Sequence, residues 1–132
     1  MSTYRLRIIT PDRVFYDGEI EKIVLKGAEG DMAILADHTP LMTTLALSEL
    51  KVFTEPKNFK MATLLGGFAK IMPDNVVILA DAAEWPEEID VERAEQAKKR
   101  AEERLKKSDQ DLIRAQAALR RAIARIKVSQ YK

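Results

Sequence analysis

The sequence predicts a β-sandwich of about eight to ten strands over residues 1–86, followed by an antiparallel α-helical hairpin over residues 87–132. All five glycines and all five prolines of the 132-residue chain lie at or before position 86. Because these residues punctuate turns and interrupt helices, their absence from the rest of the chain predicts long helices there. Trp85 is expected to anchor the two parts at their junction.

Alternating apolar and charged residues predict the first strand. Tyr4, Leu6 and Ile8 alternate with two arginines, which is the period-2 pattern of a half-buried strand. Residues 14–16 form a second apolar run that leads into Asp17-Gly18, a dipeptide that predicts a turn. Further strands are expected over residues 20–25, 32–35, 41–46 and 50–54.

Two short connections predict β-hairpins. Residues 55–58 (Glu-Pro-Lys-Asn) join two apolar runs, and residues 73–75 (Pro-Asp-Asn) join the run over 68–72 to the run over 76–80. Both connections are rich in turn residues, so each predicts an antiparallel pair of strands. Short strands that recur at this regular spacing indicate a sandwich or a barrel.

Apolar residues after position 87 recur in steps of three and four, which is the spacing of one helical face. Ser108 is predicted to open a helix cap that ends at Asp111, so the two helices follow each other closely and pack antiparallel. Because alanine buries little apolar area, we expect the hairpin to be weakly held and able to open. The first stripe comprises Ala94, Ala97, Ala101 and Leu105, and the second comprises Leu112, Ala115, Leu119, Ala122 and Ile126.

Composition excludes several classes of site. The chain has no cysteine and a single histidine, which excludes a disulfide framework, a cysteine-based metal site and a multi-histidine metal centre. Its 22 basic and 21 acidic residues leave a net charge of +1, which argues against nucleic acid or an anionic membrane as the partner of the whole chain. No apolar run approaches the ~18–20 residues that cross a bilayer, and the N-terminus lacks the apolar core of a signal peptide. We therefore expect a soluble intracellular protein.

The sequence lacks the motifs of common enzymes, namely a Gly-x-x-x-x-Gly-Lys phosphate loop, Gly-x-Gly-x-x-Gly and the Gly-x-Ser-x-Gly elbow. Asp31, Asp37 and His38 are open to two interpretations, a catalytic acid–base group or a polar turn. Gly66-Gly67-Phe68 either cradles a phosphate or forms a tight turn or bulge between strands. In both cases the turn is the commoner structure.

The arginines of the helical region carry the strongest functional signal. Arg93 and Arg100 are seven residues apart and share a face of the first predicted helix, and Arg121 and Arg125 share a face of the second. When the hairpin closes, these guanidinium groups either converge on a polyanion or lie on a solvated face and pair with nearby glutamates. Asp90 is predicted to cap the first helix.

Several short segments, spread over the whole chain, occur in a characteristic order. They are residues 6–12 (Leu-Arg-Ile-Ile-Thr-Pro-Asp), 28–41 (Ala-Glu-Gly-Asp-Met-Ala-Ile-Leu-Ala-Asp-His-Thr-Pro-Leu), 66–68, 76–80 and 82–84. Together they resemble the epsilon subunit of bacterial F-type ATP synthase. That family usually has glycine at the positions of Ala33 and Asp37. The resemblance implies a β-sandwich followed by a helical hairpin.

The resemblance also implies a non-catalytic subunit of the central rotor stalk, which lies between the gamma subunit and the ring of c subunits in a proton-translocating F-type ATP synthase. Such a subunit couples rotation of the ring to the catalytic alpha/beta head and restrains ATP hydrolysis by moving its hairpin. It is expected to lie peripherally at the cytoplasmic face of the bacterial cell membrane, without inserting into it. Asp31 and His38 are then expected at the interface with gamma and the ring.

Residues 89–94 (Ile-Asp-Val-Glu-Arg-Ala) match the Ile/Leu-Asp-x-x-Arg-Ala ATP-binding motif of epsilon subunits from some bacteria. The resemblance makes ATP a regulatory ligand, with or without magnesium, and implies contacts from Glu84, Ile89, Asp90, Arg93, Ala94, Arg100, Arg121 and Arg125. When ATP falls, the basic face of the second helix is expected to engage gamma and the acidic surface of the head. That face comprises Arg114, Arg120, Arg121, Arg125 and Lys127.

Two other functions compete with this hypothesis. A constitutive rotor clamp would have the same fold and partners, with arginines that serve inhibition and no functional ATP site. A β-domain with a basic helical hairpin could instead bind nucleic acid. The sequence, however, lacks aromatic residues interleaved with the basic ones, and the excess of basic over acidic residues in the helical region is small. We therefore expect no nucleic-acid partner.

Overall fold

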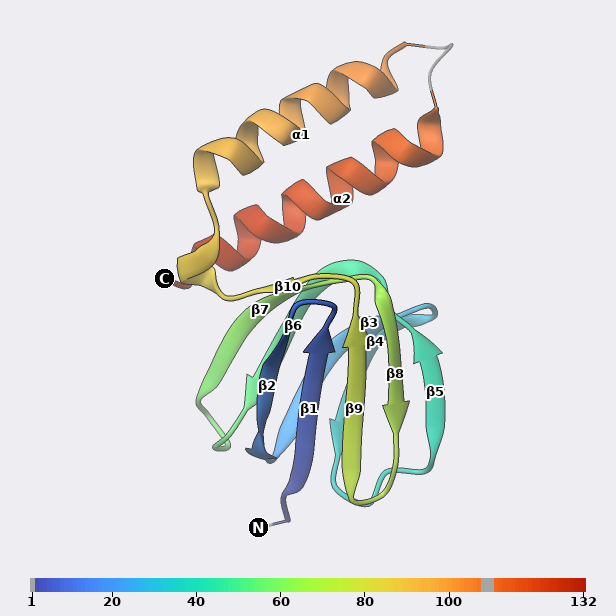
Figure 1. Cartoon of the computed structure of the whole chain (residues 1–132), viewed down its shortest axis with the longest axis vertical. Helices are drawn as coiled ribbons and strands as arrows, with labels where there is room; N and C mark the ends of the chain where they lie inside the picture. The colour runs from blue at the N-terminus through green and yellow to red at the C-terminus, as the bar shows by residue number, and fades with distance from the viewer. Residues whose placement is uncertain (1, 108–110) are drawn as a thin grey trace.

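The structure is a computed structural model and describes residues 2–107 and 111–132. Ten strands form a two-layered β-sandwich, and a pair of antiparallel helices lies across one end of it (Figure 1). The predicted fold class is therefore confirmed. The strands are β1 (Tyr4–Thr10), β2 (Arg13–Ile20), β3 (Lys22–Gly27), β4 (Gly30–Leu35), β5 (Leu41–Thr44), β6 (Leu47–Phe53), β7 (Phe59–Leu65), β8 (Gly67–Ile71), β9 (Asn75–Ala80) and β10 (Ala83–Glu84). The 3-10 helix η1 (Pro86–Glu88) leads to α1 (Val91–Leu105) and α2 (Leu112–Ser129).

Each layer of the sandwich is a five-stranded sheet. One sheet has the order β2-β1-β9-β8-β5, and the other has the order β10-β7-β6-β3-β4. Neighbouring strands run antiparallel except for β1 and β9, which are parallel, with Leu6 opposite Val76 and Ile8 opposite Ile78. Both predicted hairpins are present, since β6 pairs with β7 and β8 pairs with β9.

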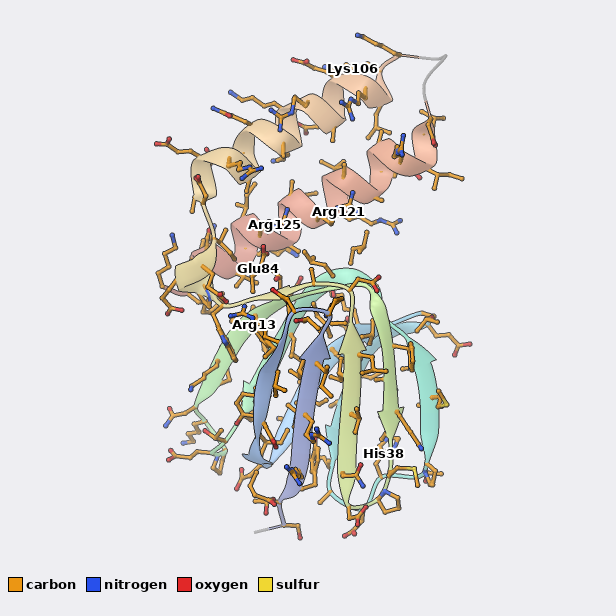
Figure 2. All side chains as sticks on the ribbon, viewed as in Figure 1. Arg13, His38, Glu84, Lys106, Arg121 and Arg125 are labelled. Carbon is orange, nitrogen blue, oxygen red and sulfur yellow. The ribbon has the colours of Figure 1, made fainter. Side chains whose placement is uncertain are left out.

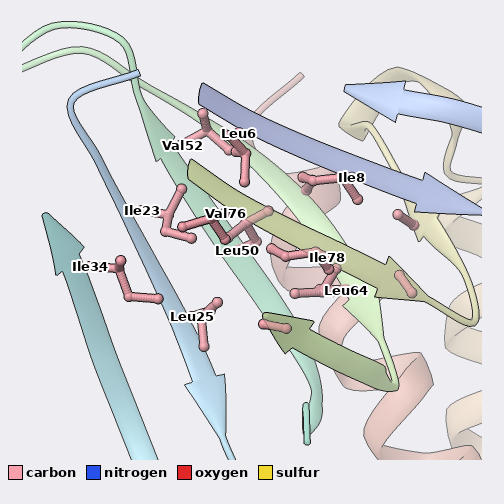
Figure 3. Packing of buried hydrophobic residues seen from close by; sticks show 14 of the residues in the cluster. Leu6, Ile8, Ile23, Leu25, Ile34, Leu50, Val52, Leu64, Val76 and Ile78 are labelled. Carbon is pink, nitrogen blue, oxygen red and sulfur yellow. The ribbon is translucent and has the colours of Figure 1, made fainter. Parts of the chain in front are cut away.

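The core lies between the two sheets, and alternate residues of β1, β3, β6 and β9 are buried in it (Figure 3). Leu6, Ile8, Ile23, Leu50 and Ile78 are fully buried, as the alternating pattern requires. The two sheets are also joined by a polar contact, because the Tyr4 hydroxyl donates a hydrogen bond of 2.5 Å to the carbonyl of Ile34. Burial of this hydroxyl raises the pKa of Tyr4.

The turn predicted at Asp17-Gly18 is wrong. Both residues lie inside β2, where Gly18 is opposite Leu6 of β1. The Asp17 carboxylate accepts two hydrogen bonds of 2.9 Å from the guanidinium of Arg5 on the neighbouring strand. Pairing with β1 therefore outweighs the local turn preference, and the chain reverses at Glu21 instead.

Gly66-Gly67 forms the connection that carries the chain from one sheet to the other, between β7 and β8. The φ angles of Gly66 and Gly67 are 83° and 106°, in the left-handed region that favours glycine. A Cβ atom on Gly67 would lie 2.0 Å from the carbonyl oxygen of Leu79. The turn interpretation of this dipeptide is thus confirmed.

The helices begin at aspartate caps. Asp90 accepts a hydrogen bond of 3.1 Å from the Arg93 backbone N–H, which confirms its predicted capping role. Asp111 accepts one of 3.2 Å from the Arg114 backbone N–H and is the N-cap of α2. Ser108, predicted to open the cap of α2, lies outside the described residues.

Four alanines of the predicted stripes are buried in the hairpin. They are Ala94 and Ala101 of α1 and Ala115 and Ala122 of α2. Leu112 departs from the prediction, because it is the first residue of α2, beside the connection from α1, and is 46% exposed. None of the helices in the described residues is long and apolar enough to span a lipid bilayer.

A second apolar face of α2 was not predicted and holds the hairpin on the sandwich. Within the described residues α2 contacts β6 and β7, and its Val128 is fully buried against Met61 and Ile89. Ala124, one turn before Val128, is also buried. The C-terminal half of α2 therefore provides the docking surface.

Substitution of Gly67 tests the sheet-to-sheet connection. We expect Gly67→Ala to lower the free energy of unfolding by about 3–5 kcal/mol, because the new Cβ adds a backbone clash to the strain of a positive φ. Gly30→Ala is the matched control, since Gly30 also has a positive φ of 123° but a Cβ there meets nothing within 4 Å. The control should lose only about 1–2 kcal/mol in urea denaturation. Equal losses in the two variants would contradict the proposed clash.

Candidate functional site

A cavity of about 410 Å³ lies at the junction between the sandwich and the hairpin. Its lining residues come from β10, η1, the segment that follows η1, α1 and α2, and α2 contributes Arg125. A volume of this size is typical of sites for small molecules. The lining residues are Glu84, Glu88, Ile89, Asp90, Arg93, Ala94, Ala97, Arg100 and Arg125.

Two arginines reach the cavity from α1. The Asp90 cap sets the start of the helix, and this places Arg93 in its first turn. Arg100 follows seven residues later and therefore projects from nearly the same face. Both arginines line the cavity, as the spacing predicts.

Arg125 reaches the cavity from α2 and is held by Glu84 (Figure 2). Its Nε donates a hydrogen bond of 2.9 Å to Oε1 of Glu84, and the side chains of the pair are 33% and 25% exposed. The same carboxylate oxygen accepts a hydrogen bond of 3.1 Å from the hydroxyl of Thr63 on β7. This partly buried ion pair connects the hairpin to the sandwich.

Seven of the eight residues implied by the resemblance line the cavity, and Arg121 is not among the lining residues. Arg121 lies one helical turn before Arg125 on α2 and is half-buried. Ile89 has a second environment, because its side chain is 5% exposed and packs with Met61 and Val128.

Glu88 and Arg13 form an ion pair at the cavity that the sequence did not reveal. Arg13 Nη2 lies 2.8 Å from each carboxylate oxygen of Glu88, and Glu88 itself lines the cavity. Glu88 Oε1 also accepts a hydrogen bond of 2.8 Å from the Trp85 backbone N–H. The hydrogen bond from Arg13 is the main reason that the pKa of Glu88 is lowered. Glu88 lies three residues after Trp85, a spacing typical of a helix cap, but no local pattern in the sequence predicts that it pairs with a residue on β2.

Trp85 anchors the junction as predicted. Its ring is half-buried and stacks on the ring of Phe15, with centroids 4.3 Å apart. The ring of Tyr16 meets its edge at 6.2 Å. The connection to the hairpin therefore begins from a residue packed against the sandwich core.

Asp31 and His38 lie near opposite ends of β4, so the structure does not bring them together. Figure 2 shows His38 at the end of the sandwich far from the hairpin. Its Nδ1 lies 2.6 Å from the carbonyl oxygen of Thr39, and the Asp37 N–H donates a hydrogen bond of 2.8 Å to the carbonyl of Pro73. Asp37 has a φ of 61°, a left-handed conformation that aspartate tolerates better than most residues. The polar-turn interpretation is thus confirmed.

The basic face of α2 is partly occupied in this conformation. Lys127 lies 3.8 Å from the carboxylate of Glu49 on β6, and that carboxylate is also 3.4 Å from Lys26. Arg125 is paired with Glu84 as described above. Arg114 and Arg120 are exposed.

The outer face of the β2-β1-β9-β8-β5 sheet carries exposed apolar side chains that the sequence analysis did not single out. They lie on neighbouring strands, because Ile9 of β1 is opposite both Val14 and Leu79, and Leu79 is opposite Phe68. A cluster of exposed apolar residues of this kind is typical of a protein-docking surface. This outer apolar face comprises Val14 (56% exposed), Met42 (63%), Phe68 (40%) and Leu79 (41%).

Residues 3–86 match a family model described as ATP synthase, Delta/Epsilon chain, beta-sandwich domain, and residues 87–130 match the long alpha-helix domain of the same chain. The ATP synthase epsilon chain of Clostridium novyi is 50% identical over 127 residues, which cover 96% of this chain and 97% of that protein. The sodium ion specific epsilon chain of Acetobacterium woodii is 53% identical over 103 residues, or 78% and 77% of the two chains. A chain in a Euglena gracilis mitochondrial ATP synthase structure (OSCP/F1/c-ring) shares the fold, with a TM-score of 0.81, 24% identity and coverage of 100% and 83%.

The Arg13–Glu88 pair predicts a pH dependence of stability. Because the pKa of Glu88 is lowered in the folded chain, the pair stabilises the fold above the ordinary glutamate pKa and is lost as pH falls through the folded value. Glu88→Gln should therefore reduce the loss of stability between about pH 5 and pH 2, by about 0.5 kcal/mol for a half-exposed pair.

Thermal unfolding across that pH range measures the effect. Glu29→Gln is the control, because Glu29 is exposed in the β3–β4 turn and forms no ion pair among residues 2–107 and 111–132. If Glu88→Gln and the parent chain lose the same stability between about pH 5 and pH 2, the pair contributes nothing to the free energy of unfolding.

Proposed function

This chain belongs to the delta/epsilon chain family of ATP synthase, as an epsilon subunit of the central stalk, and we propose that its hairpin restrains ATP hydrolysis until ATP binds. ATP would occupy the cavity between η1, α1 and α2 and hold the hairpin against the sandwich. The subunit would perform no chemistry itself. It would transmit rotation of the c-ring to the catalytic head.

The observation that carries this proposal is the set of three arginines that line one cavity. Arg93 and Arg100 come from α1 and Arg125 comes from α2, so a ligand that binds all three joins the two helices. Guanidinium groups bind phosphate oxygens through paired hydrogen bonds, and a triphosphate offers enough oxygens for several such contacts. Arg121, one turn away, would reach the phosphates by a change of side-chain conformation.

The energetics support a hairpin that can be switched. The buried residues between α1 and α2 are alanines, and α2 docks through Val128, Met61 and Ile89 at about 1.5–3 kcal/mol for each large apolar side chain that is fully buried. A ligand that binds only the closed form adds about 2.7 kcal/mol at a hundredfold excess over its dissociation constant. That increment is comparable with the contribution of one of these side chains, so ATP concentration would shift the population of the closed form.

Release of α2 would expose the inhibitory basic face. In the closed form Lys127 is paired with Glu49 and Arg125 with Glu84, so both would lose these partners on opening. We propose that the freed face then binds gamma and the acidic surface of the alpha/beta head and blocks rotation in the direction of hydrolysis. The complete face comprises Arg114, Arg120, Arg121, Arg125 and Lys127.

We assign gamma to the outer apolar face, because exposed apolar residues on adjacent strands suit a stable protein contact. The c-ring is proposed to meet the sandwich as well, with Asp31 facing a polar loop of the ring and His38 near gamma. Because these residues are near opposite ends of β4, they would contact different parts of the stalk. This placement makes the chain a peripheral subunit at the cytoplasmic face of the cell membrane. Protons are the expected coupling ion.

A constitutive clamp is the second candidate. It is favoured by the Glu84–Arg125 ion pair, which already occupies one of the three arginines and holds the hairpin closed without any ligand. In that case the arginines would act only in the inhibition of ATP hydrolysis and would not bind ATP. ATP titration separates the two functions.

Isothermal titration of the full chain with ATP, with and without magnesium, tests the proposal. We expect saturable binding to one site, and we expect Arg93→Ala with Arg121→Ala to weaken it at least tenfold, because two phosphate-binding charges are lost. Lys99→Ala is the matched control, since it removes a positive charge from the exposed surface of α1 and does not line the cavity.

Limited proteolysis gives an independent measurement. ATP should slow cleavage within the hairpin of the parent chain and of Lys99→Ala, and it should leave cleavage of the double variant unchanged. If ATP neither binds nor protects the parent chain, the constitutive clamp becomes the preferred function.

A further inference from the structure

We infer that Arg13 is a positioning residue for the cavity. Its guanidinium group binds and neutralises the carboxylate of Glu88, a cavity-lining residue, so that this carboxylate does not repel a bound polyphosphate. This inference rests on the proposed ATP function. It adds a residue of the sandwich, far from the helices in sequence, to a site whose cations otherwise come from the hairpin.

Glu88 is an unfavourable residue for an anion site. Glu88 lines the same cavity as Arg93, Arg100 and Arg125. A free carboxylate there would repel phosphate oxygens and compete with them for the guanidinium groups. Glu84 is already engaged by Arg125 and Thr63, and Asp90 accepts the Arg93 backbone N–H at the helix cap, so Glu88 is the lining acid that Arg13 contacts.

Arg13 supplies that partner with defined geometry. Its Nη2 is 2.8 Å from both carboxylate oxygens of Glu88, so the charges are in direct contact. The same atom lies 3.4 Å from the carbonyl oxygen of Ala83 on β10. The Trp85 backbone N–H fixes the carboxylate from the other side through its hydrogen bond to Oε1. The pKa values agree with this geometry, since that of Glu88 is lowered and that of Arg13 is raised.

The sandwich core fixes the position of Arg13. The guanidinium carbon lies 5.1 Å from the centroid of the Phe15 ring, which is buried and stacks on Trp85. Arg13 therefore approaches Glu88 from β2 of the sandwich and not from the helical hairpin.

A double-mutant experiment on the full chain tests this role. ATP affinity is measured by isothermal titration for the parent chain, Arg13→Ala, Arg13→Lys, Glu88→Gln and the Arg13→Ala/Glu88→Gln double variant. Glutamine keeps the oxygen that accepts the Trp85 N–H and removes only the charge, so the local cap is preserved.

We expect Arg13→Ala to raise the dissociation constant about tenfold, because an unneutralised charge then lies beside the phosphates. Arg13→Lys should raise it less, since the charge is kept. The double variant should return to within about threefold of the parent, because removal of Glu88 removes the repulsion. The loss in Arg13→Ala should shrink in about 1 M salt, where the Debye length falls to about 3 Å.

Each other result overturns the inference in a recognisable way. A parent chain that does not bind ATP overturns the proposed ATP site and this inference together. Normal binding by Arg13→Ala overturns the inference alone. A loss that persists in the double variant and in high salt shows that Arg13 supports the fold of the junction and has no electrostatic role at the cavity.

Discussion

The docking of the C-terminal half of α2 on the sandwich is the contact on which the functional geometry depends. Val128 is buried against Met61 of β7 and Ile89 of the connecting segment, and Arg125 is paired with Glu84 of β10. Without this contact the cavity loses one wall and one of its three arginines. Few large apolar side chains form this contact, and the buried residues between α1 and α2 are alanines. A site formed by a weak contact is well suited to respond to a ligand.

Arg125 and Lys127 have one set of acidic partners in the closed conformation, and the proposed open conformation would give them another. Ion pairing would therefore take part in the regulation of the hairpin. In the closed conformation the sandwich supplies Glu84 and Glu49 to Arg125 and Lys127. In the proposed open conformation the acidic surface of the catalytic head would replace them. The two sets cannot be used together, because each requires a different position of α2. ATP would favour the closed set by adding phosphate charges between α1 and α2.

Much of the site was predictable because its residues follow local rules. Arg93 and Arg100 lie on one face since they are seven residues apart on a helix, and Asp90 caps that helix as its position indicates. Arg121 shows the limit of this reasoning. Helical spacing places it on the face of Arg125, but the depth at which α2 packs decides which of the two reaches the cavity wall.

Local periodicity, turn residues and helix caps determined by themselves that a β-sandwich precedes a helical hairpin, and the order of the local sequences indicated the family. Only the tertiary structure decided which distant residues meet. It placed Asp17-Gly18 inside a strand opposite β1, gave α2 a second apolar face at Val128, and brought Arg13 to Glu88 across 75 positions of sequence. The physical reason is that periodicity reports how a segment faces its surroundings, whereas the identity of its partner depends on how separate segments pack in space.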